Sequence, residues 1–357
     1  MRKTRLATVY AVANTIILAV GVLLTFAIAW QNGNDSTIEN IIGLAISLIL
    51  APVLHELGHI VLAHANKMRV VYAKFFCFKI YEKEGKRRFG FASPFGADET
   101  QTIPMQSGNM QKRACAYTLG GLVFGGGLLF AVFFGALLCT LLHKTSFLLW
   151  GALPYLAYLF LLNALPMEYA SGKTDMAVYL GLKNGNDAEK NMLSAMEIHG
   201  CLSEGKSFAE IDEKFYFDTP QLAEDEPLFA VMLDLRYRYY LDKNEMEKAG
   251  DCLNRLLPCV RDYLPEPEAE KIAAEFVYIH SLLHDLERAE ECGKTCQAYL
   301  RGETVTAKRV LAAFSAAFGK TESVAPLLEQ AEELLKKERI AGVAKFEKNL
   351  LSKIRLG

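Results

Sequence analysis

Residues 38–65 of the chain are IENIIGLAISLILAPVLHELGHIVLAHA, an apolar run that carries His55, Glu56 and His59 in its second half. A helix needs about 20 mostly apolar residues to cross the hydrocarbon of a bilayer, so this run predicts a membrane-spanning helix. Ionisable side chains are costly inside such a helix and mark functional positions. The stretch therefore indicates a membrane protein and locates its chemistry.

His55 and His59 are four residues apart, so a helix places both imidazoles on one face, where they can bind one metal ion. Glu56 follows His55 directly. The pattern His-Glu-x-x-His is that of zinc hydrolases, in which the carboxylate takes a proton from a metal-bound water. The alternative is a polar cluster that only packs against neighbouring helices.

A catalytic zinc ion usually has three protein ligands, so a further ligand must come from another part of the chain. His64 lies about 140° round the helix from His59 and points elsewhere. Glu168 and Asp175 follow the last apolar run and are the remaining candidates, and Gly172 allows the chain to turn back before Asp175.

The 357-residue chain has a formal net charge of −2 that is unevenly divided. Residues 1–182 contain 15 Lys and Arg against 9 Asp and Glu, whereas residues 183–357 contain 24 against 32. Neither part has a dense basic run interleaved with aromatic residues, so no nucleic-acid partner is predicted. The eight cysteines lack paired CxxC spacing, which favours reduced thiols over a disulfide framework.

Three more apolar runs have membrane length, at residues 6–30, 114–142 and 147–165. Ala27-Ile28-Ala29 imitates a signal-peptide cleavage site, but the first run is longer than a typical signal-peptide core, so we expect a retained helix. Gly120, Gly121 and the glycines after them predict close helix packing in the third run. The fourth run ends at Pro166, which breaks the helix.

The segment between the second and third runs has a different pattern. Residues 70–81 (VVYAKFFCFKIY) are β-branched and aromatic, and residues 89–95 resume an aromatic pattern after a charged turn. This predicts a small β-hairpin, followed by irregular chain around Pro94, Gly96 and Pro104. Because hydrocarbon does not tolerate open strand edges, we expect the hairpin at the membrane interface or between the helices.

Basic residues orient the four predicted spans. The 66–113 loop has ten Lys and Arg and the N-terminus has three, whereas the two loops on the other side contain only Lys144. The positive-inside rule then places both termini and the hairpin in the cytosol.

Residues 183–357 contain amphipathic patterns of ordinary helix length and a weak repeat. Residues 246–252 (MEKAGDC) recur as residues 286–292 (LERAEEC), and a looser copy surrounds residues 319–328. A period near 34–40 residues is typical of tetratricopeptide-like α-solenoids that bind protein partners, and a plain helical bundle fits the pattern as well. The predicted fold is an all-α polytopic membrane protein, with four transmembrane helices and a small β-hairpin, followed by a soluble all-α C-terminal domain.

The membrane part resembles the site-2 protease family of intramembrane zinc metalloproteases. The resemblance rests on the motif at residues 55–59, on Asn163-Ala164-Leu165-Pro166 and on Thr174-Asp175-Met176. It implies His55, His59 and Asp175 as Zn²⁺ ligands, Glu56 as general base, and Asn163 beside the bound peptide or its oxyanion. It divides the chain into an extra N-terminal helix (1–35), a protease core (36–182) and a cytosolic helical domain (183–357).

The implied activity is cleavage of membrane-spanning segments of a single-span protein or peptide, in a bacterial cell membrane and in contact with its lipid. The implied substrates are a regulatory protein, a remnant signal peptide or a peptide precursor, and the tail is expected to hold a cytosolic partner. A non-catalytic membrane scaffold that binds partners through its tail is the main alternative. A metal transporter is a weaker one, because the other apolar runs contain few polar residues.

Overall fold

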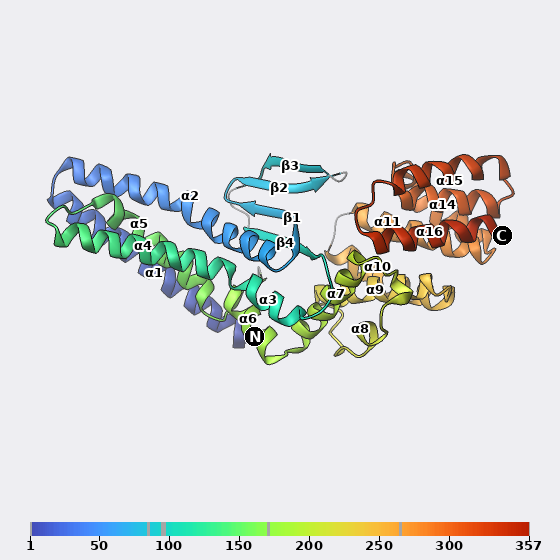
Figure 1. Ribbon diagram of the computed structural model, residues 1–357, viewed down its shortest axis with the longest axis horizontal. Coiled ribbons are helices and arrows are strands. Elements are labelled where there is room, and N and C mark those ends of the chain that lie inside the picture. Colours follow the sequence, from blue (N-terminus) through green and yellow to red (C-terminus); the bar gives the residue numbers. More distant parts are fainter. Residues whose placement is uncertain (1, 84–85, 94–97, 170–171, 264–265, 357) are drawn as a thin grey trace. The chain divides into compact units, whose positions relative to one another are not determined.

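The computed structural model describes residues 2–83, 86–93, 98–169, 172–263 and 266–356, most of which are helical. The chain forms two compact units, residues 1–103 with 109–186 and residues 104–108 with 187–357 (Figure 1). The helices of the first unit are α1 (Arg2–Gln31), α2 (Asn34–Ala65), α3 (Met110–Thr118), α4 (Gly120–Leu141), α5 (Phe147–Ala164) and α6 (Asp175–Asn184).

Within the described residues, four helices are long and apolar enough to cross a membrane, as the sequence predicts. They span Leu6–Gln31, Asn34–Ala65, Met110–Leu141 and Phe147–Ala164, and the third of them contains both α3 and α4. Large apolar side chains such as Leu23, Phe134 and Leu138 are more than half exposed on these helices. A surface of this kind is suited to lipid and not to water.

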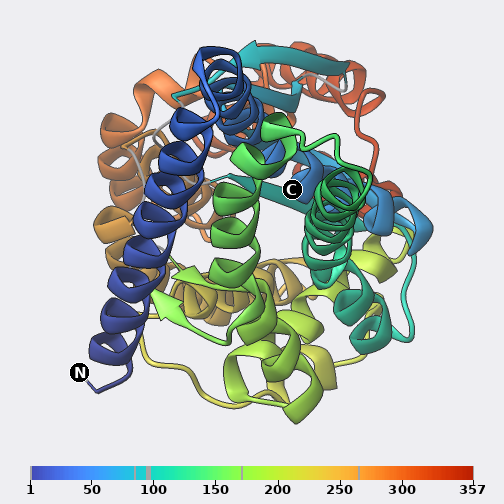
Figure 2. The same cartoon turned by 90° about the vertical axis from the view of Figure 1, so that its left-hand side faces the viewer.

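Helix α2 contacts α1, α4 and α5 (Figure 2). It contains the His-Glu-x-x-His motif. Its glycines allow close approach of two neighbours. A Cβ on Gly43 would lie 2.0 Å from the Leu148 carbonyl oxygen of α5, and one on Gly58 would lie 2.1 Å from the Gly120 carbonyl oxygen of α4. Small residues therefore set how closely α4 and α5 pack against the motif helix.

A four-stranded sheet replaces the single predicted hairpin. Its strands are β1 (Met68–Phe75), β2 (Phe78–Lys83), β3 (Lys86–Phe91) and β4 (Glu99–Pro104), in the spatial order β3-β2-β1-β4 (Figure 1). Strand β2 is antiparallel to both β1 and β3, with Phe75 opposite Phe78 and Phe78 opposite Phe91.

Two details of the predicted hairpin are wrong. The run 70–81 is two strands and not one, because Phe76 takes a left-handed backbone (φ 54°) that turns the chain back on itself. The stretch expected to be irregular forms strand β4 up to Pro104, which is tolerated at the end of an edge strand because proline lacks only the N–H donor. Pro94 and Gly96 lie outside the described residues.

The second unit consists of helices joined by short turns, and the elements below belong to it. They are α7 (Asp187–Ser203), a 3₁₀ turn (Phe208–Glu210), α8 (Lys214–Phe217), α9 (Pro227–Asp242), α10 (Met246–Tyr263), α11 (Glu266–Leu282), α12 (Leu286–Thr295), α13 (Gln297–Leu300), α14 (Val305–Ala317), α15 (Thr321–Leu335) and α16 (Ala341–Leu356).

The weak sequence repeat coincides with a repeated turn between paired helices. Asn244, His284 and Gly319 end the first helix of the pairs α9–α10, α11–α12 and α14–α15, with φ of 65°, 57° and 72°. After each of them, the next residue donates its N–H to the carbonyl five positions back, at 2.8–2.9 Å. Left-handed residues with this hydrogen bond end helices, so each copy of the repeat marks the start of a second helix.

A fully buried ion network holds several helices of the second unit together. Arg309 of α14 is 0% exposed; its Nε donates to Glu347 of α16 at 2.8 Å and its Nη2 donates to Glu275 of α11 at 2.8 Å. Glu275 also accepts from the Tyr237 hydroxyl of α9 at 2.6 Å, and the guanidinium lies over the Tyr278 ring. Buried charges of this kind are tolerated when they are paired and hydrogen-bonded.

Candidate metal centre

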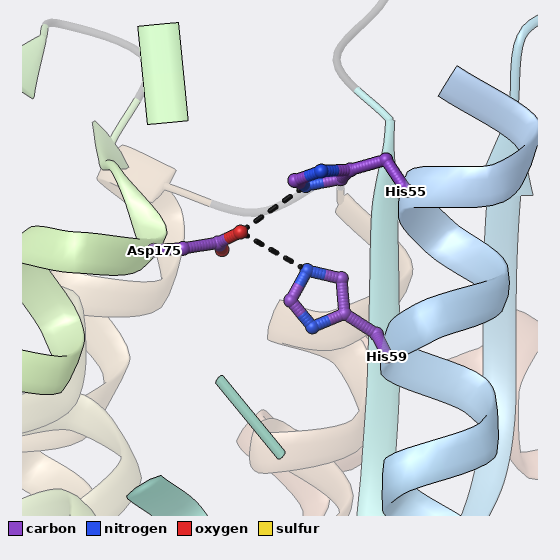
Figure 3. Close-up of side chains that lie close together, drawn as sticks. All are labelled: His55, His59 and Asp175. Atoms are coloured by element: carbon purple, nitrogen blue, oxygen red, sulfur yellow. Dashed lines mark ion pairs between the residues drawn. The ribbon is translucent and has the colours of Figure 1, made fainter. Parts of the chain in front are cut away.

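Three side chains from two distant segments converge on one point. The Nε2 atoms of His55 and His59 on α2 lie 3.1 and 3.2 Å from the Oδ2 atom of Asp175 on α6. Figure 3 shows the two imidazoles pointing from one helix face toward the carboxylate, which approaches from the opposite side. Both histidines are more than nine-tenths buried, and the Asp175 side chain is 19% exposed. Within the described part of the chain, this is the one cluster of His, Cys, Asp and Glu that could hold a metal ion.

Asp175 is placed by the turn that follows α5. The chain leaves α5 at Leu165 in extended conformation, before Pro166, and reverses through a small hairpin of β5 (Glu168–Tyr169) and β6 (Gly172–Lys173). Gly172 has a φ of 134°, in the region that glycine enters without strain.

Thr174 then anchors the start of α6. Its hydroxyl accepts from the N–H groups of Ala177 and Met167 and donates to the Leu165 carbonyl at 2.7 Å. Thr174 is therefore an N-cap that ties the first turn of α6 to the end of α5. Asp175 is the first residue of α6, where the helix dipole favours a negative charge.

The second ring nitrogen of His59 has a partner that fixes its tautomer. Nδ1 lies 3.0 Å from the carbonyl oxygen of Tyr117 on α3. A carbonyl only accepts, so Nδ1 carries the hydrogen, and in the neutral imidazole Nε2 presents a lone pair. That lone pair faces the Asp175 oxygen, and two acceptors at this distance repel each other unless a cation lies between them.

The end of α2 is held against α3 by Arg113. Its guanidinium donates to the carbonyl oxygens of Asn66 and Lys67 at 2.8 and 2.9 Å, beyond the last turn of α2. Cations at helix C-termini stabilise the unpaired carbonyls there. This contact fixes α3, and with it the Tyr117 carbonyl, beside His59.

Gly121 leaves the space that the two imidazoles occupy. A Cβ at Gly121 would lie 2.4 Å from His55 Cε1, 2.5 Å from His55 Nε2 and 2.6 Å from His59 Nε2. Real carbon contacts of this length do not occur, so any other residue would displace the rings. The glycine is therefore required by the site, beyond the general close packing that the sequence predicts.

The types of donor atom and the two nitrogen–oxygen distances fit a zinc ion. Two imidazole nitrogens and one carboxylate oxygen are a common ligand set of catalytic zinc. Ligand atoms about 2.0–2.1 Å from a tetrahedral zinc lie roughly 3.3–3.4 Å from one another, close to the 3.1 and 3.2 Å observed between the nitrogens and the oxygen. His55, His59 and Asp175 would hold the metal.

Burial and the facing histidines act in opposite directions on Asp175. Burial raises the pKa of its carboxyl, but interaction with the His55 and His59 imidazoles outweighs burial and lowers the pKa to about 2. The carboxyl is therefore ionised at neutral pH, as a metal ligand must be.

Glu56 lies beside the cluster and is held by the sheet. Its side chain is buried, and its Oε2 accepts a hydrogen bond from the Thr100 hydroxyl of β4 at 2.6 Å. The Tyr117 hydroxyl donates to the Thr100 carbonyl, so the residue that orients His59 also holds the strand that orients Glu56. A carboxylate with one oxygen fixed keeps its other oxygen available to accept a proton.

Glu168 and His64 do not belong to this cluster. Glu168 is exposed in β5, where it lies opposite Lys173 of β6 in the strand register. His64 is exposed in the last turn of α2. Asn163 is half-buried in the last turn of α5 and donates its amide to the Leu159 carbonyl at 3.2 Å. Its predicted role beside a peptide or oxyanion stays a prediction.

Three positioning residues are missing from the sequence-based prediction. Thr174 carries a readable signal, since a threonine directly before an acidic residue and a helical run is a typical N-cap. Thr100 and Tyr117 carry none, because their roles depend on which strand and which carbonyl the fold brings to α2.

No family profile, curated protein or solved structure matches the chain.

Proposed function

We propose that this chain is a membrane-embedded, zinc-dependent endopeptidase that resembles the site-2 proteases. The observation that carries the proposal is the convergence of His55, His59 and Asp175 at 3.1–3.2 Å within a chain of four candidate membrane helices. Glu56 beside this cluster supplies the carboxylate that hydrolysis needs. A site that only binds metal has no need of this group.

The roles of the residues follow from their positions. When bound, zinc supplies a Lewis acid that lowers the pKa of its water towards about 7 and polarises the scissile carbonyl. Glu56 takes a proton from the attacking water and delivers it to the leaving amine as the peptide bond breaks. The Tyr117 carbonyl keeps the hydrogen of His59 on Nδ1, so that Nε2 stays a metal ligand. Asn163 is proposed to contact the bound peptide.

The substrate class is a membrane-spanning segment of a single-span protein or peptide. In such a helix the carbonyls are occupied by internal hydrogen bonds, so the segment must unwind before attack. Strand β4 lies at one edge of the sheet, and its Thr100 contacts Glu56. An open edge pairs readily with an extended peptide, so β4 is the edge that would present an unwound substrate to the base.

The orientation rests on the charge of the loops. By the positive-inside rule, the basic 66–113 loop and N-terminus favour an orientation with both termini in the cytosol, which we propose to be that of a bacterial cell. A topology reporter fused near Asp35 should register outside the cytosol, and one fused near Glu84 should register inside it. The opposite pattern would reverse the orientation and place the site on the other side.

The proposal is tested by co-expressing the chain with a model single-span substrate. Wild type should cleave it, and Glu56→Gln and His59→Ala should abolish cleavage while the protein stays membrane-inserted at the same level. Glu39→Gln, on the same helix but outside the cluster, is the matched control and should cleave like wild type. Cleavage that survives Glu56→Gln would exclude the mechanism.

A non-catalytic scaffold is the second candidate, and the paired helices of the second unit favour it. Repeated helix pairs stacked as an α-solenoid form surfaces that bind other proteins. In that case Glu56→Gln would leave binding of a protein partner intact, and a deletion of residues 187–357 would abolish that binding.

A further inference from the structure

The second unit contains an open groove between paired helices. It has a volume of about 1200 Å³ and is lined by the start of α10, the α11–α12 turn, α14, α15 and the end of α16. Apolar side chains line much of it, including Leu282, Leu283, Ala313, Val324, Leu328 and Ile354. The volume exceeds the roughly 300–1,000 Å³ of typical small-molecule pockets, so the groove is large enough for a peptide segment.

One large apolar residue of the groove is strongly exposed. Leu283 is 49% exposed in the turn between α11 and α12. Together with the partly exposed Val324 in the same groove, Leu283 offers a surface that an apolar side chain of a partner would cover.

The groove also carries an excess of negative charge. Four glutamates and two lysines line it: Glu245, Glu247, Glu329, Glu332, Lys248 and Lys353. Positive charge on a partner would complement this surface, and the glutamates would repel acidic partners.

Both lysines are already engaged inside the unit. Lys248 pairs with Glu245 at 2.5 Å, and Lys353 donates to the carbonyls of Leu241 and Asp242 at 3.0 and 3.4 Å, at the end of α9. Both ammonium groups therefore already have polar partners within the unit. Glu247 and Glu329 are exposed on α10 and α15, and within the described chain neither has an ion-pair partner.

We infer that this groove binds a segment that is both basic and partly apolar, of the kind that flanks a membrane-spanning helix on its Lys- and Arg-rich side. Apolar side chains of the segment would cover Leu283 and Val324, and its cations would lie against Glu247 and Glu329. Membrane proteins carry such segments at the cytosolic ends of their spans, which makes them the natural partners of a chain that itself has four candidate spans. The inference rests on the proposed cytosolic location of the second unit, but it goes beyond the peptidase proposal and needs no catalysis.

The test uses the full chain in neutral detergent and two fluorescein-labelled synthetic peptides. One alternates leucine and alanine with lysine, and the other carries glutamate in place of lysine. Fluorescence anisotropy should show saturable binding of the lysine peptide that weakens as salt is raised, and no saturable binding of the glutamate peptide. Equal binding of both peptides would overturn the inference.

Two variants test the contacts. Glu247→Gln with Glu329→Gln should weaken binding of the lysine peptide about five- to tenfold, as expected for two exposed charge pairs. Leu283→Ser should also weaken it. The matched control, Glu287→Gln with Glu322→Gln, removes two exposed charges outside the groove and should bind like wild type.

The remaining outcomes are decisive as well. An equal loss in the control pair would mean that overall charge governs binding, which would overturn the inference. Glu56→Gln should bind the peptide like wild type, so a failed cleavage assay leaves this result standing. If the groove variants change the oligomeric state measured by light scattering, and not peptide binding, the groove is an interface between copies of the chain and the inference is wrong.

Discussion

The two units each bury a cluster of ionisable side chains, and the clusters differ in how their charges are paired. In the second unit, both carboxylates around Arg309 receive hydrogen bonds from its guanidinium at 2.8 Å. In the first unit, by contrast, the His59 Nε2 lone pair faces the Asp175 oxygen at 3.2 Å while its Nδ1 hydrogen is committed to a carbonyl. The Arg309 cluster is held by hydrogen bonds between its own members, whereas Asp175 Oδ2 has no hydrogen-bond partner, an arrangement that a bound cation would satisfy. Pairing, and not burial, separates a structural cluster from a candidate site.

The largest effect expected is loss of zinc from Asp175→Ala. The substitution removes one of three ligands, so zinc affinity should fall by at least about a hundredfold, more than the loss of an outer hydrogen-bond partner causes. Competition with a chromophoric chelator measures it on the purified full chain. Glu168→Ala is the control and should keep zinc. If Asp175→Ala keeps zinc and Glu168→Ala loses it, the third ligand is Glu168 and not Asp175.

Arg309→Met should affect the second unit and leave the metal site unchanged. It leaves Glu275 and Glu347 buried without their cation, which costs about 3–5 kcal/mol. Hydrogen exchange of α11 and α14 in the full chain should speed up accordingly, with zinc affinity unchanged. Adding Glu275→Gln and Glu347→Gln should restore most of the protection. A variant that loses zinc instead would show that the two clusters are coupled.

Gly121→Ala tests the space around the imidazoles. Its Cβ would lie 2.4–2.6 Å from the histidine rings, so the rings must move, and zinc affinity should fall about tenfold or more. Gly127→Ala is the matched control on the same helix, because a Cβ there meets nothing within 4 Å. Equal zinc affinity in both variants would contradict the described packing of α4 against α2.

Thr100→Val tests the link between strand β4 and the base. Loss of the 2.6 Å hydrogen bond to Glu56 frees the carboxylate to rotate, so kcat on a model substrate should fall about tenfold with zinc affinity unchanged. Thr100→Ser keeps the hydroxyl and should restore most of the rate. Equal loss in both variants would mean that Thr100 acts through packing and not through its hydrogen bond.

The smallest effect expected is a pH dependence in the second unit. Burial of His199, together with the neighbouring Arg238 charge, lowers its pKa, whereas Asp234 acts in the opposite direction. The folded unit therefore keeps His199 neutral, while the unfolded chain takes up a proton below about pH 6.5. The stability contribution is full above that pH and is lost as the pH falls, by at most about 1.4 kcal/mol per pH unit.

The His199→Gln variant should reduce this dependence between pH 7 and pH 5. Hydrogen exchange of α7 and α9, compared with wild type at each pH, measures it without interference from the intrinsic exchange rate. An unchanged dependence would assign the effect to another residue.

Local patterns predicted much of the architecture, because they follow from neighbouring residues alone. The spans depend on length and apolarity, and the pairing of His55 with His59 on one face depends only on helical spacing. The hairpin was predicted less well, because the apolar run 70–81 shows no sign of the left-handed Phe76 that divides it into β1 and β2.

The sequence by itself determined four apolar helices, the His-Glu-x-x-His face and a short set of candidates for the third ligand. Only the tertiary structure brought Asp175 to the histidines and left Glu168 in an exposed hairpin. It also brought the Tyr117 carbonyl within hydrogen-bond distance of His59 and the Thr100 hydroxyl within hydrogen-bond distance of Glu56. It packed Gly121, which has no side chain, against both imidazole rings. The reason is physical: each contact joins residues more than forty positions apart, and the packing of α3, α4, α6 and β4 around α2 sets their distances.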